Sequence, residues 1–219
     1  MGTLYSGAVY APKKSTDDLV VATHGVLQRL GLTLDEPPSV SVIDTEADED
    51  VPEYRAVDLQ DAVQYMRRWP CTTALEYSLL GLRPARQVNL KGFGVTVFFG
   101  SRGALSRVGL SFLGNVFNQF PDAHPRIVAV IEALHNELGA LRSGFDWGLY
   151  DVVDDEEAEA RSLELNDVQP RPSQWLDIID KGLVTPAIKT FYHREAKPGS
   201  VLRTTANGSL FWQRDAGPP

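Results

Sequence analysis

The sequence contains one cysteine and no long hydrophobic run, and both scarcities limit what this protein can be. Cys71 is the single cysteine among 219 residues, so no disulfide can form within the chain. Such sparing use of cysteine is typical of a reducing compartment. No apolar run approaches the roughly 20 residues that a membrane-spanning helix needs, and residues 1–10 lack the basic and then apolar pattern of a secretory signal. We therefore expect a cytoplasmic protein with no membrane partner.

Basic residues are outnumbered, and the acidic residues are grouped in two blocks. The formal net charge is −8, from 21 Lys and Arg against 29 Asp and Glu. Residues 35–61 hold ten acids and one base, and residues 146–167 hold nine acids and one base. Nucleic acid attracts clustered Lys and Arg, so this pattern argues against a nucleic-acid partner and favours a basic one. The alternative interpretation is that acidic loops only keep the protein in solution.

Motifs that carry catalytic, metal or phosphate chemistry are missing. There is no Gly-x-Ser-x-Gly elbow, and Cys71 has no histidine nearby in the sequence. Glu132 and His135 form one Glu-x-x-His motif, whereas a di-iron bundle needs two. The glycine-rich stretches 91–94 and 100–103 do not match a phosphate-binding loop and suit turns around a hairpin. We expect no catalytic residue, no metal and no cofactor.

Hydrophobic periodicity predicts mixed helices and strands in the first third of the chain. Ser15 and Asp18 resemble a capping box, and apolar residues then recur at helical spacing until Gly31 supplies a stop. Asp58 and Asp61 form a second cap-like pair before a short helix. Alternating apolar residues predict strands at 4–10 and 40–43. Residues 74–80 fit a strand or a helix, and we favour the strand.

The middle of the chain predicts a hairpin, a long helix and a further strand. Apolar side chains alternate over residues 93–99 and again over 108–112, which indicates two antiparallel strands. Pro125 suits the first turn of a helix that ends near Gly144, and a strand is expected over 145–153. This order is part of a ferredoxin-like unit. We predict an α+β fold, with an antiparallel sheet and helices packed on one face.

The C-terminal residues predict short helices and a closing hairpin. We expect helices at 175–179 and 183–192, and strands 201–204 and 209–212 joined through Asn207-Gly208. Residues 1–219 are predicted to form a single α+β domain. Residues 170–219 are either a C-terminal extension of it or a separate subdomain, and the sequence leaves that choice and the oligomeric state open.

Short motifs along the chain resemble those of bacterial toxin-immunity proteins, which accompany type VI secretion or polymorphic toxins. The C-terminal matching stretches are Pro170-Arg171-Pro172-Ser173-Gln174-Trp175-Leu176, Leu183-Val184, Leu202 and Asn207-Gly208-Ser209-Leu210-Phe211. Residues 5–10 before the helix that Ser15 caps, and the strand 145–151, are loosely similar as well. The resemblance implies a non-enzymatic protein that neutralises a cognate toxin or effector by covering it.

On that hypothesis an acidic patch would steer association with a basic toxin. The candidate contact residues are Asp44, Glu46, Asp48, Glu49, Asp50 and Glu53 in the first block, and Asp154, Asp155, Glu156, Glu157 and Glu159 in the second. Two other functions stay open. One is a small-molecule-binding domain with an apolar pocket between the strands 93–99 and 108–112. The other is a metal-dependent enzyme that uses carboxylates.

Overall fold

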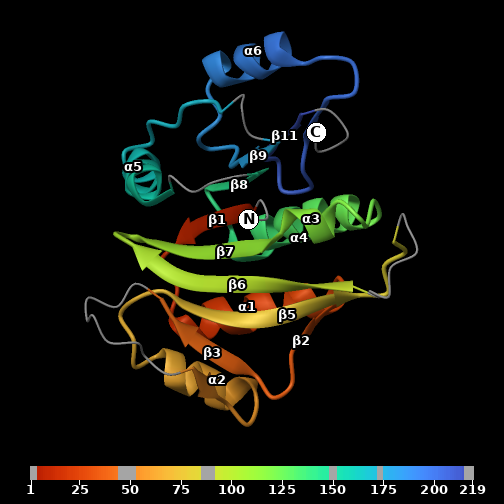
Figure 1. Ribbon diagram of the computed structural model, residues 1–219. Coiled ribbons are helices and arrows are strands. Elements are labelled where there is room, and N and C mark those ends of the chain that lie inside the picture. The colour runs from red at the N-terminus through yellow and green to blue at the C-terminus, as the bar shows by residue number, and fades with distance from the viewer. Residues whose placement is uncertain (1–3, 44–52, 85–91, 148–151, 172–174, 215–219) are drawn as a thin grey trace.

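The computed structural model describes residues 4–43, 53–84, 92–147, 152–171 and 175–214 (Figure 1). Its helices are α1 (Thr16–Arg29), α2 (Leu59–Met66), α3 (Gly114–Phe117), α4 (Ala123–Leu138), α5 (Val152–Glu164) and α6 (Pro186–Glu195). Its strands are β1 (Leu4–Pro12), β2 (Leu32–Leu34), β3 (Ser39–Val42), β4 (Tyr54–Arg55), β5 (Thr73–Leu80), β6 (Gly92–Arg102), β7 (Leu105–Leu113), β8 (Arg142–Trp147), β9 (Leu176–Ile179), β10 (Val201–Thr204) and β11 (Leu210–Gln213).

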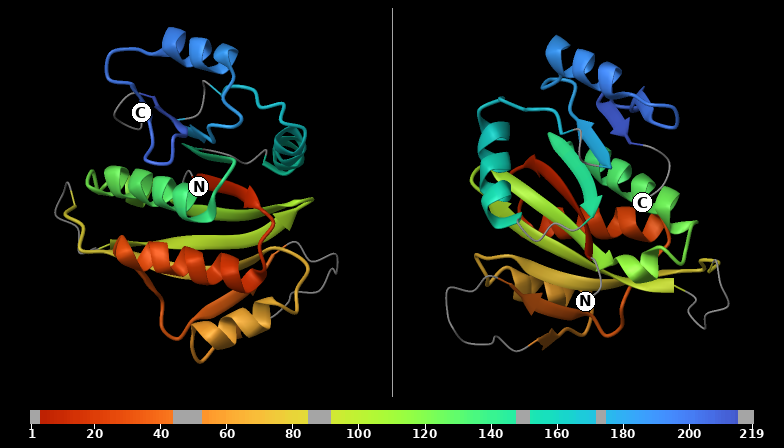
Figure 2. Two further views of the ribbon diagram at one scale, coloured as in Figure 1. Left: turned by 180° about the vertical axis from the view of Figure 1, so that it is seen from behind. Right: turned by 45° about the horizontal axis from the view of Figure 1, so that its top comes forward.

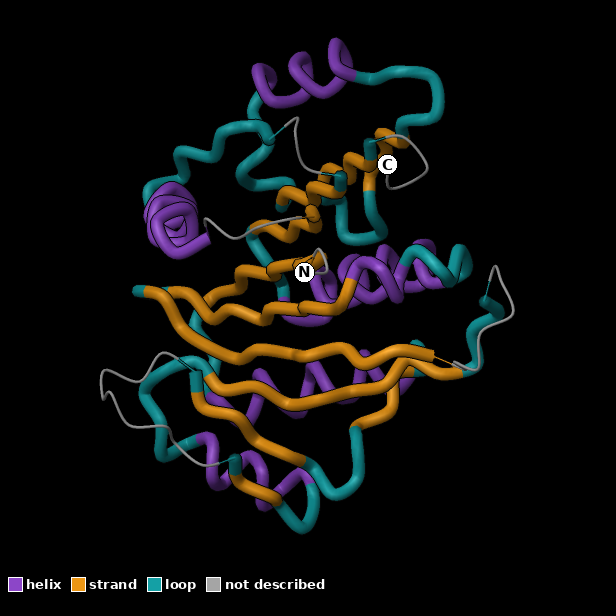
Figure 3. The backbone as a smooth tube through the Cα atoms, in the orientation of Figure 1, coloured by secondary structure: helices purple, strands orange, loops and turns teal. Residues whose placement is uncertain are grey.

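All these strands belong to one twisted sheet (Figure 3). The strand order is β10-β11-β9-β8-β1-β7-β6-β5-β3-β4, and β2 also pairs with β5. Every pairing is antiparallel, for example Val9 opposite Val108 on one side of β1 and opposite Ser143 on the other. The predicted α+β class with an antiparallel sheet is confirmed.

The centre of the sheet contains the predicted strand, strand, helix and strand. The strands β6 and β7 form the hairpin, α4 follows, and β8 returns to the sheet with β1 between it and β7. Since β7 and β8 are both antiparallel to β1, they run parallel to each other, which makes β7-α4-β8 a split β-α-β unit. The sheet is therefore ferredoxin-like in part, as predicted.

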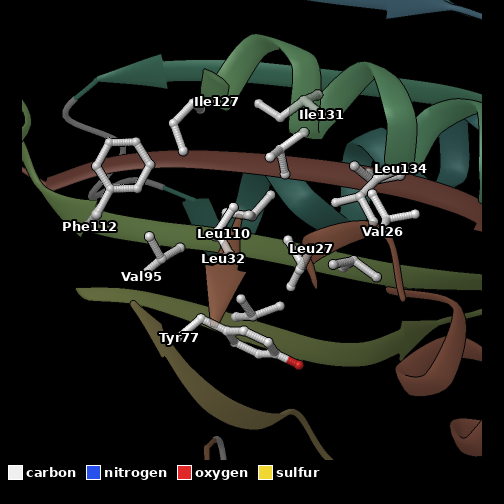
Figure 4. Close-up of a cluster of buried hydrophobic side chains, with 14 of the residues drawn as sticks. Val26, Leu27, Leu32, Tyr77, Val95, Leu110, Phe112, Ile127, Ile131 and Leu134 are labelled. Carbon is white, nitrogen blue, oxygen red and sulfur yellow. The ribbon is translucent and has the colours of Figure 1, made fainter. Parts of the chain in front are cut away.

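The two faces of the sheet carry different helices, as the alternation of side chains along β1 reveals. Tyr5 and Val9 belong to the main hydrophobic core, whereas Tyr10 belongs to a second cluster on the opposite face. The helices α1, α2 and α4 supply the main core, and α1 and α4 lie side by side across the sheet (Figure 2, left; Figure 4). These three helices fit the prediction of helices on one face. The structure adds α5 and α6, which pack in the second cluster.

Local capping explains where several helices begin and end. The Ser15 hydroxyl oxygen accepts a hydrogen bond from the amide of Asp18 at 3.1 Å, and the Asp58 carboxylate accepts from the amide of Asp61 at 2.8 Å. Both predicted caps are confirmed. The helix α4 ends at Gly139, whose φ of 63° is the left-handed conformation that glycine adopts without strain, five residues before the predicted stop.

One predicted element near the C-terminus is wrong, and a second is wrong in part. The predicted helix at 175–179 is the strand β9, in which Ile178 packs in the main core and Ile179 packs in the second cluster. Apolar residues on both faces give a continuous run that periodicity cannot separate from a buried helix. The strand predicted over 145–153 is present at residues 145–147 as part of β8, and residues 148–151 lie outside the described residues. Its last two residues, Val152 and Val153, instead begin α5, which also contains the acidic run.

The C-terminal strands extend the same sheet and are tied to α4. β9 pairs with β8, β11 pairs with β9, and the predicted β10–β11 hairpin is present. Arg203 on β10 binds Glu132 on α4 through two hydrogen bonds of 2.7 and 2.5 Å, and its guanidinium lies 3.8 Å from the ring centroid of Phe211. In the described part of the chain, no helix has both the length and the apolar character needed to cross a membrane.

Candidate functional site

Of the six contact residues predicted in the first acidic block, the structure describes only Glu53. Asp44, Glu46, Asp48, Glu49 and Asp50 lie outside the described residues, and Glu53 is exposed directly before β4. The carboxylates of Glu53 and Asp35 both interact electrostatically with the carboxylate of Glu76 on β5. Burial raises the pKa of the half-buried Glu76, a hydrogen bond to Thr96 lowers it, and the two like charges raise it further. This part of the surface is therefore negatively charged.

The five contact residues predicted in the second acidic block all lie on α5, but the side chains that the structure describes differ in exposure. Asp154, Asp155 and Glu156 lie on this helix, and their side chains are outside the described part of the structure. Glu157 is exposed, as a contact residue must be. Glu159 is only 4% exposed, so its assignment to a contact surface is corrected: its carboxylate lies inside the protein, next to the guanidinium groups of Arg142 and Arg171.

Glu159 belongs to a buried network of charged groups that joins α5, β8, β9 and α6. Arg142 donates to the Asp177 carboxylate at 2.9 and 2.6 Å, and its third nitrogen lies 3.3 Å from Glu159. The hydroxyl of Tyr192 donates to Asp177 as well and accepts from the amide of Arg171 at 3.0 Å. Burial alone would lower the pKa of Arg142, but the charge of Asp177 and its hydrogen bonds hold that pKa above its ordinary value. The network fixes the second cluster in place and has no exposed reacting group.

The pocket predicted on the face of the β6–β7 hairpin is filled by the core. The apolar side chains of both strands belong to the main core and are buried, so this face of the hairpin is covered (Figure 4). These residues are Phe93, Val95, Val97, Phe99, Val108, Leu110 and Phe112. The prediction is wrong because a hydrophobic strand face indicates burial without indicating what covers it.

Two hollows are present on the surface beside α2 instead. The first has a volume of about 570 Å³ and is lined by parts of α1, β2, the β2–β3 loop and the start of α2. The second has a volume of about 470 Å³ and lies between α1 and α2. Leu59, the first residue of α2, lines both hollows, so they adjoin each other, and the pair is called the groove below. No motif in the sequence indicates this groove, because its walls come from segments far apart in the chain.

Two histidines have roles that their sequence spacing does not reveal. His24 on α1 lines the first hollow, and its Nδ1 lies 3.1 Å from the hydroxyl of the buried Tyr77. His135 on α4 is fully buried, with its two ring nitrogens 2.9 and 3.0 Å from the hydroxyls of Ser143 and Ser209. Burial lowers the pKa of His24 and lowers that of His135 to about 4. Among the described residues, no group of three or more His, Cys, Asp or Glu is placed to hold a metal ion.

Comparison with known proteins gives a likeness of fold and no family. No protein-family model matches this chain, and no curated protein matches its sequence. Among solved structures, it is similar to the Pseudomonas aeruginosa T6SS protein PA0821, with a TM-score of 0.50 and 12% identity. The match covers 97% of this chain and 66% of the other, so this chain spans about two thirds of that protein's length.

A second solved structure matches this chain less well. It is the toxic C-terminal tip of CdiA from Pseudomonas aeruginosa in complex with an immune protein, matched with a TM-score of 0.38 and 12% identity. That match covers 69% of this chain and 90% of the other. At such identities, the likeness to the T6SS protein concerns the fold alone.

Proposed function

We propose that this chain neutralises a bacterial toxin or effector protein by binding and covering it, without catalysing a reaction itself. The observation that carries the proposal is the group of acids beside β5: Asp35 is held against this strand by its amide, which donates to the Glu76 carbonyl at 3.1 Å, and by its carboxylate, which accepts from the Ser78 hydroxyl at 2.8 Å. The charges of Asp35 and Glu53 both reach the carboxylate of Glu76. Such an acidic surface attracts a partner that presents lysine and arginine side chains and speeds their association. We place this action in the cytoplasm.

The fold supports the same proposal from a different direction. It is shared over 97% of this chain with a protein named as part of a type VI secretion system, and the sequence motifs resemble immunity proteins that accompany such toxins. Neutralisation by covering needs a complementary surface of about 800 Å² on each partner. The described surface has ample area for this contact, since the accessible surface of the protein is 11687 Å².

The proposed contact residues are the contact acids predicted from the sequence, without the buried Glu159. They are Asp44, Glu46, Asp48, Glu49, Asp50 and Glu53, together with Asp154, Asp155, Glu156 and Glu157. If charge reversal in both blocks changes neither the affinity for the partner nor its dependence on salt, the electrostatic part of the proposal is wrong.

The proposal is tested by isolating the partner and measuring its toxicity. The tagged protein is purified from its native host, and the proteins that co-purify are identified by mass spectrometry. We expect a stoichiometric partner that stops bacterial growth when produced alone and is harmless when produced with this chain. A partner that stays equally toxic in the presence of this chain would overturn the proposal.

A further inference from the structure

We infer that the groove between α1 and α2 is the docking site for the protein partner, and that its first hollow takes a lysine or arginine side chain. This inference rests on the proposed function and locates where the partner binds.

The groove has the size and the lining of a site for protruding side chains. Its first hollow is lined by Leu34, Pro37, Pro38 and Leu59 on the apolar side and by His24, Gln28 and Thr33 on the polar side. Its second hollow continues past Leu59 between Val21 of α1 and Val63 of α2. Both helices lie on the same side of the sheet (Figure 2, left). A partner can therefore fill two adjacent hollows from one direction.

Val57 stands at the rim of the first hollow and is held there with its side chain in water. It is 86% exposed, yet its amide donates to the Asp61 carboxylate at 3.0 Å. The hydroxyl of Tyr54 donates to the same carboxylate, also at 3.0 Å, and the amide of Ala56 donates to the carbonyl of Pro38 at 2.8 Å. The chain on both sides of Val57 is thus fixed before any partner arrives. A fixed contact residue loses little conformational freedom on binding, which favours affinity.

Val21 provides a second exposed aliphatic side chain, in the second hollow. It is 58% exposed on α1, on the side of the helix that faces the groove. Each hollow thus has one exposed valine at its edge, and the two hollows meet at Leu59. Apolar side chains grouped around a depression and surrounded by polar ones are typical of an interaction site.

The charges at the first hollow select a basic partner side chain. Glu36 and Asp58 line it, and the side chain of His24 is uncharged at neutral pH because burial lowers its pKa. In the second hollow, Arg67 is bound to Asp17, so these two charges offset each other. The acids of the first hollow have no such partner among its lining residues.

A long basic side chain matches this arrangement in both of its parts. The aliphatic stem of a lysine or arginine packs on Pro37, Pro38 and Val57, and its charged end reaches Glu36 or Asp58. Tyr77 contacts His24 in the first hollow, whereas its neighbours Glu76 and Ser78 on β5 point to the opposite face, where Ser78 binds Asp35. The acids that select the basic side chain are therefore those of the hollow itself, Glu36 and Asp58.

The test compares two triple variants that make the same chemical changes on different elements. The groove variant carries Glu36→Gln, Val57→Ala and Asp58→Asn, and Asn caps a helix as well as Asp does. The control variant carries Glu164→Gln, Leu165→Ala and Asp167→Asn at the end of α5 and just after it, outside the proposed contact residues, and Leu165 is 66% exposed. Both sets remove two charges and shorten one exposed aliphatic side chain. Thermal unfolding of each free variant verifies that the fold is retained.

Affinity for the partner isolated with the wild-type chain is then measured by calorimetry. We expect the groove variant to bind at least about tenfold more weakly, which is about 1.4 kcal/mol, and the control variant to bind as the wild type does. If the wild-type complex forms and the groove variant binds equally well, the docking site is wrong while the proposed function stands. If only the control variant weakens binding, the site lies on α5 and the inference is overturned. If the wild-type chain forms no complex, the proposed function itself fails.

Discussion

The substitution Arg142→Met removes the cation from the buried charged network and leaves two carboxylates without it. Arg142 is 3% exposed and makes hydrogen bonds of 2.9 and 2.6 Å to Asp177, with Glu159 at 3.3 Å from its third nitrogen. Methionine is unbranched, uncharged and shorter, so the change removes the interactions and fills the space of the aliphatic part of Arg142.

The expected cost follows from what remains in the network. Removing one partner of a buried ion pair destabilises a protein by about 3–5 kcal/mol. Here Tyr192 still donates to Asp177, and Arg171 still lies beside Glu159, so we expect the lower end, about 3 kcal/mol. That is a large part of the roughly 5–15 kcal/mol by which a domain of ordinary stability is folded.

Urea unfolding at pH 7, followed by circular dichroism, measures this loss. The double variant Arg142→Met/Asp177→Asn should lose less than the sum of its single variants by at least about 1 kcal/mol, because the two side chains interact directly. The control Arg29→Met breaks the exposed Arg29–Glu137 pair and should cost at most about 0.5 kcal/mol. A loss under about 1 kcal/mol for Arg142→Met, or additive single effects, would refute the view that this network stabilises the second cluster.

Three further outcomes are expected. Ser15→Ala should lower the unfolding free energy by about 1 kcal/mol by removing the cap of α1, whereas Ser15→Asp should retain it, as urea unfolding will reveal. Burial holds the pKa of His135 at about 4 against 6.5 in the unfolded chain, so the unfolded state binds more protons between these values. Stability should therefore fall as pH drops from 6.5 to 4, by at most about 3 kcal/mol, and His135→Gln should remove this dependence in unfolding curves taken across that range. Val57→Ala should leave the melting temperature unchanged to within about 1 °C, because its side chain is 86% exposed, and a larger drop would mean that Val57 packs in the folded protein.

Elements with local signals could be predicted from the sequence. The Ser15 and Asp58 caps, the β6–β7 hairpin and the Asn207-Gly208 hairpin depend on residues close together in the chain, and each is present in the structure. The helix α5 could not be predicted, since its acidic first half resembles a loop. The contacts that stabilise α5 are with residues far away in the sequence: Leu163 packs in the second cluster, and Glu159 forms an ion pair with Arg142.

The candidate groove was beyond sequence reasoning for a related reason. His24, Glu36 and Val57 come from α1, the β2–β3 loop and the turn before α2, and they meet only because β2 and β3 both pair with β5. The acidic composition around Glu53 was visible in the sequence. The buried position of Glu159 was not, because a carboxylate inside an ion pair and one in solvent have the same sequence signal.

Neutralisation by binding is tested most directly by bacterial growth during controlled production of the isolated partner, with and without this chain. We predict that the partner alone stops growth, that the wild-type chain restores it, and that the groove variant restores it less at equal protein levels. Growth that stays arrested in the presence of the wild-type chain, with both proteins folded and produced, would contradict the proposal that this protein neutralises its partner.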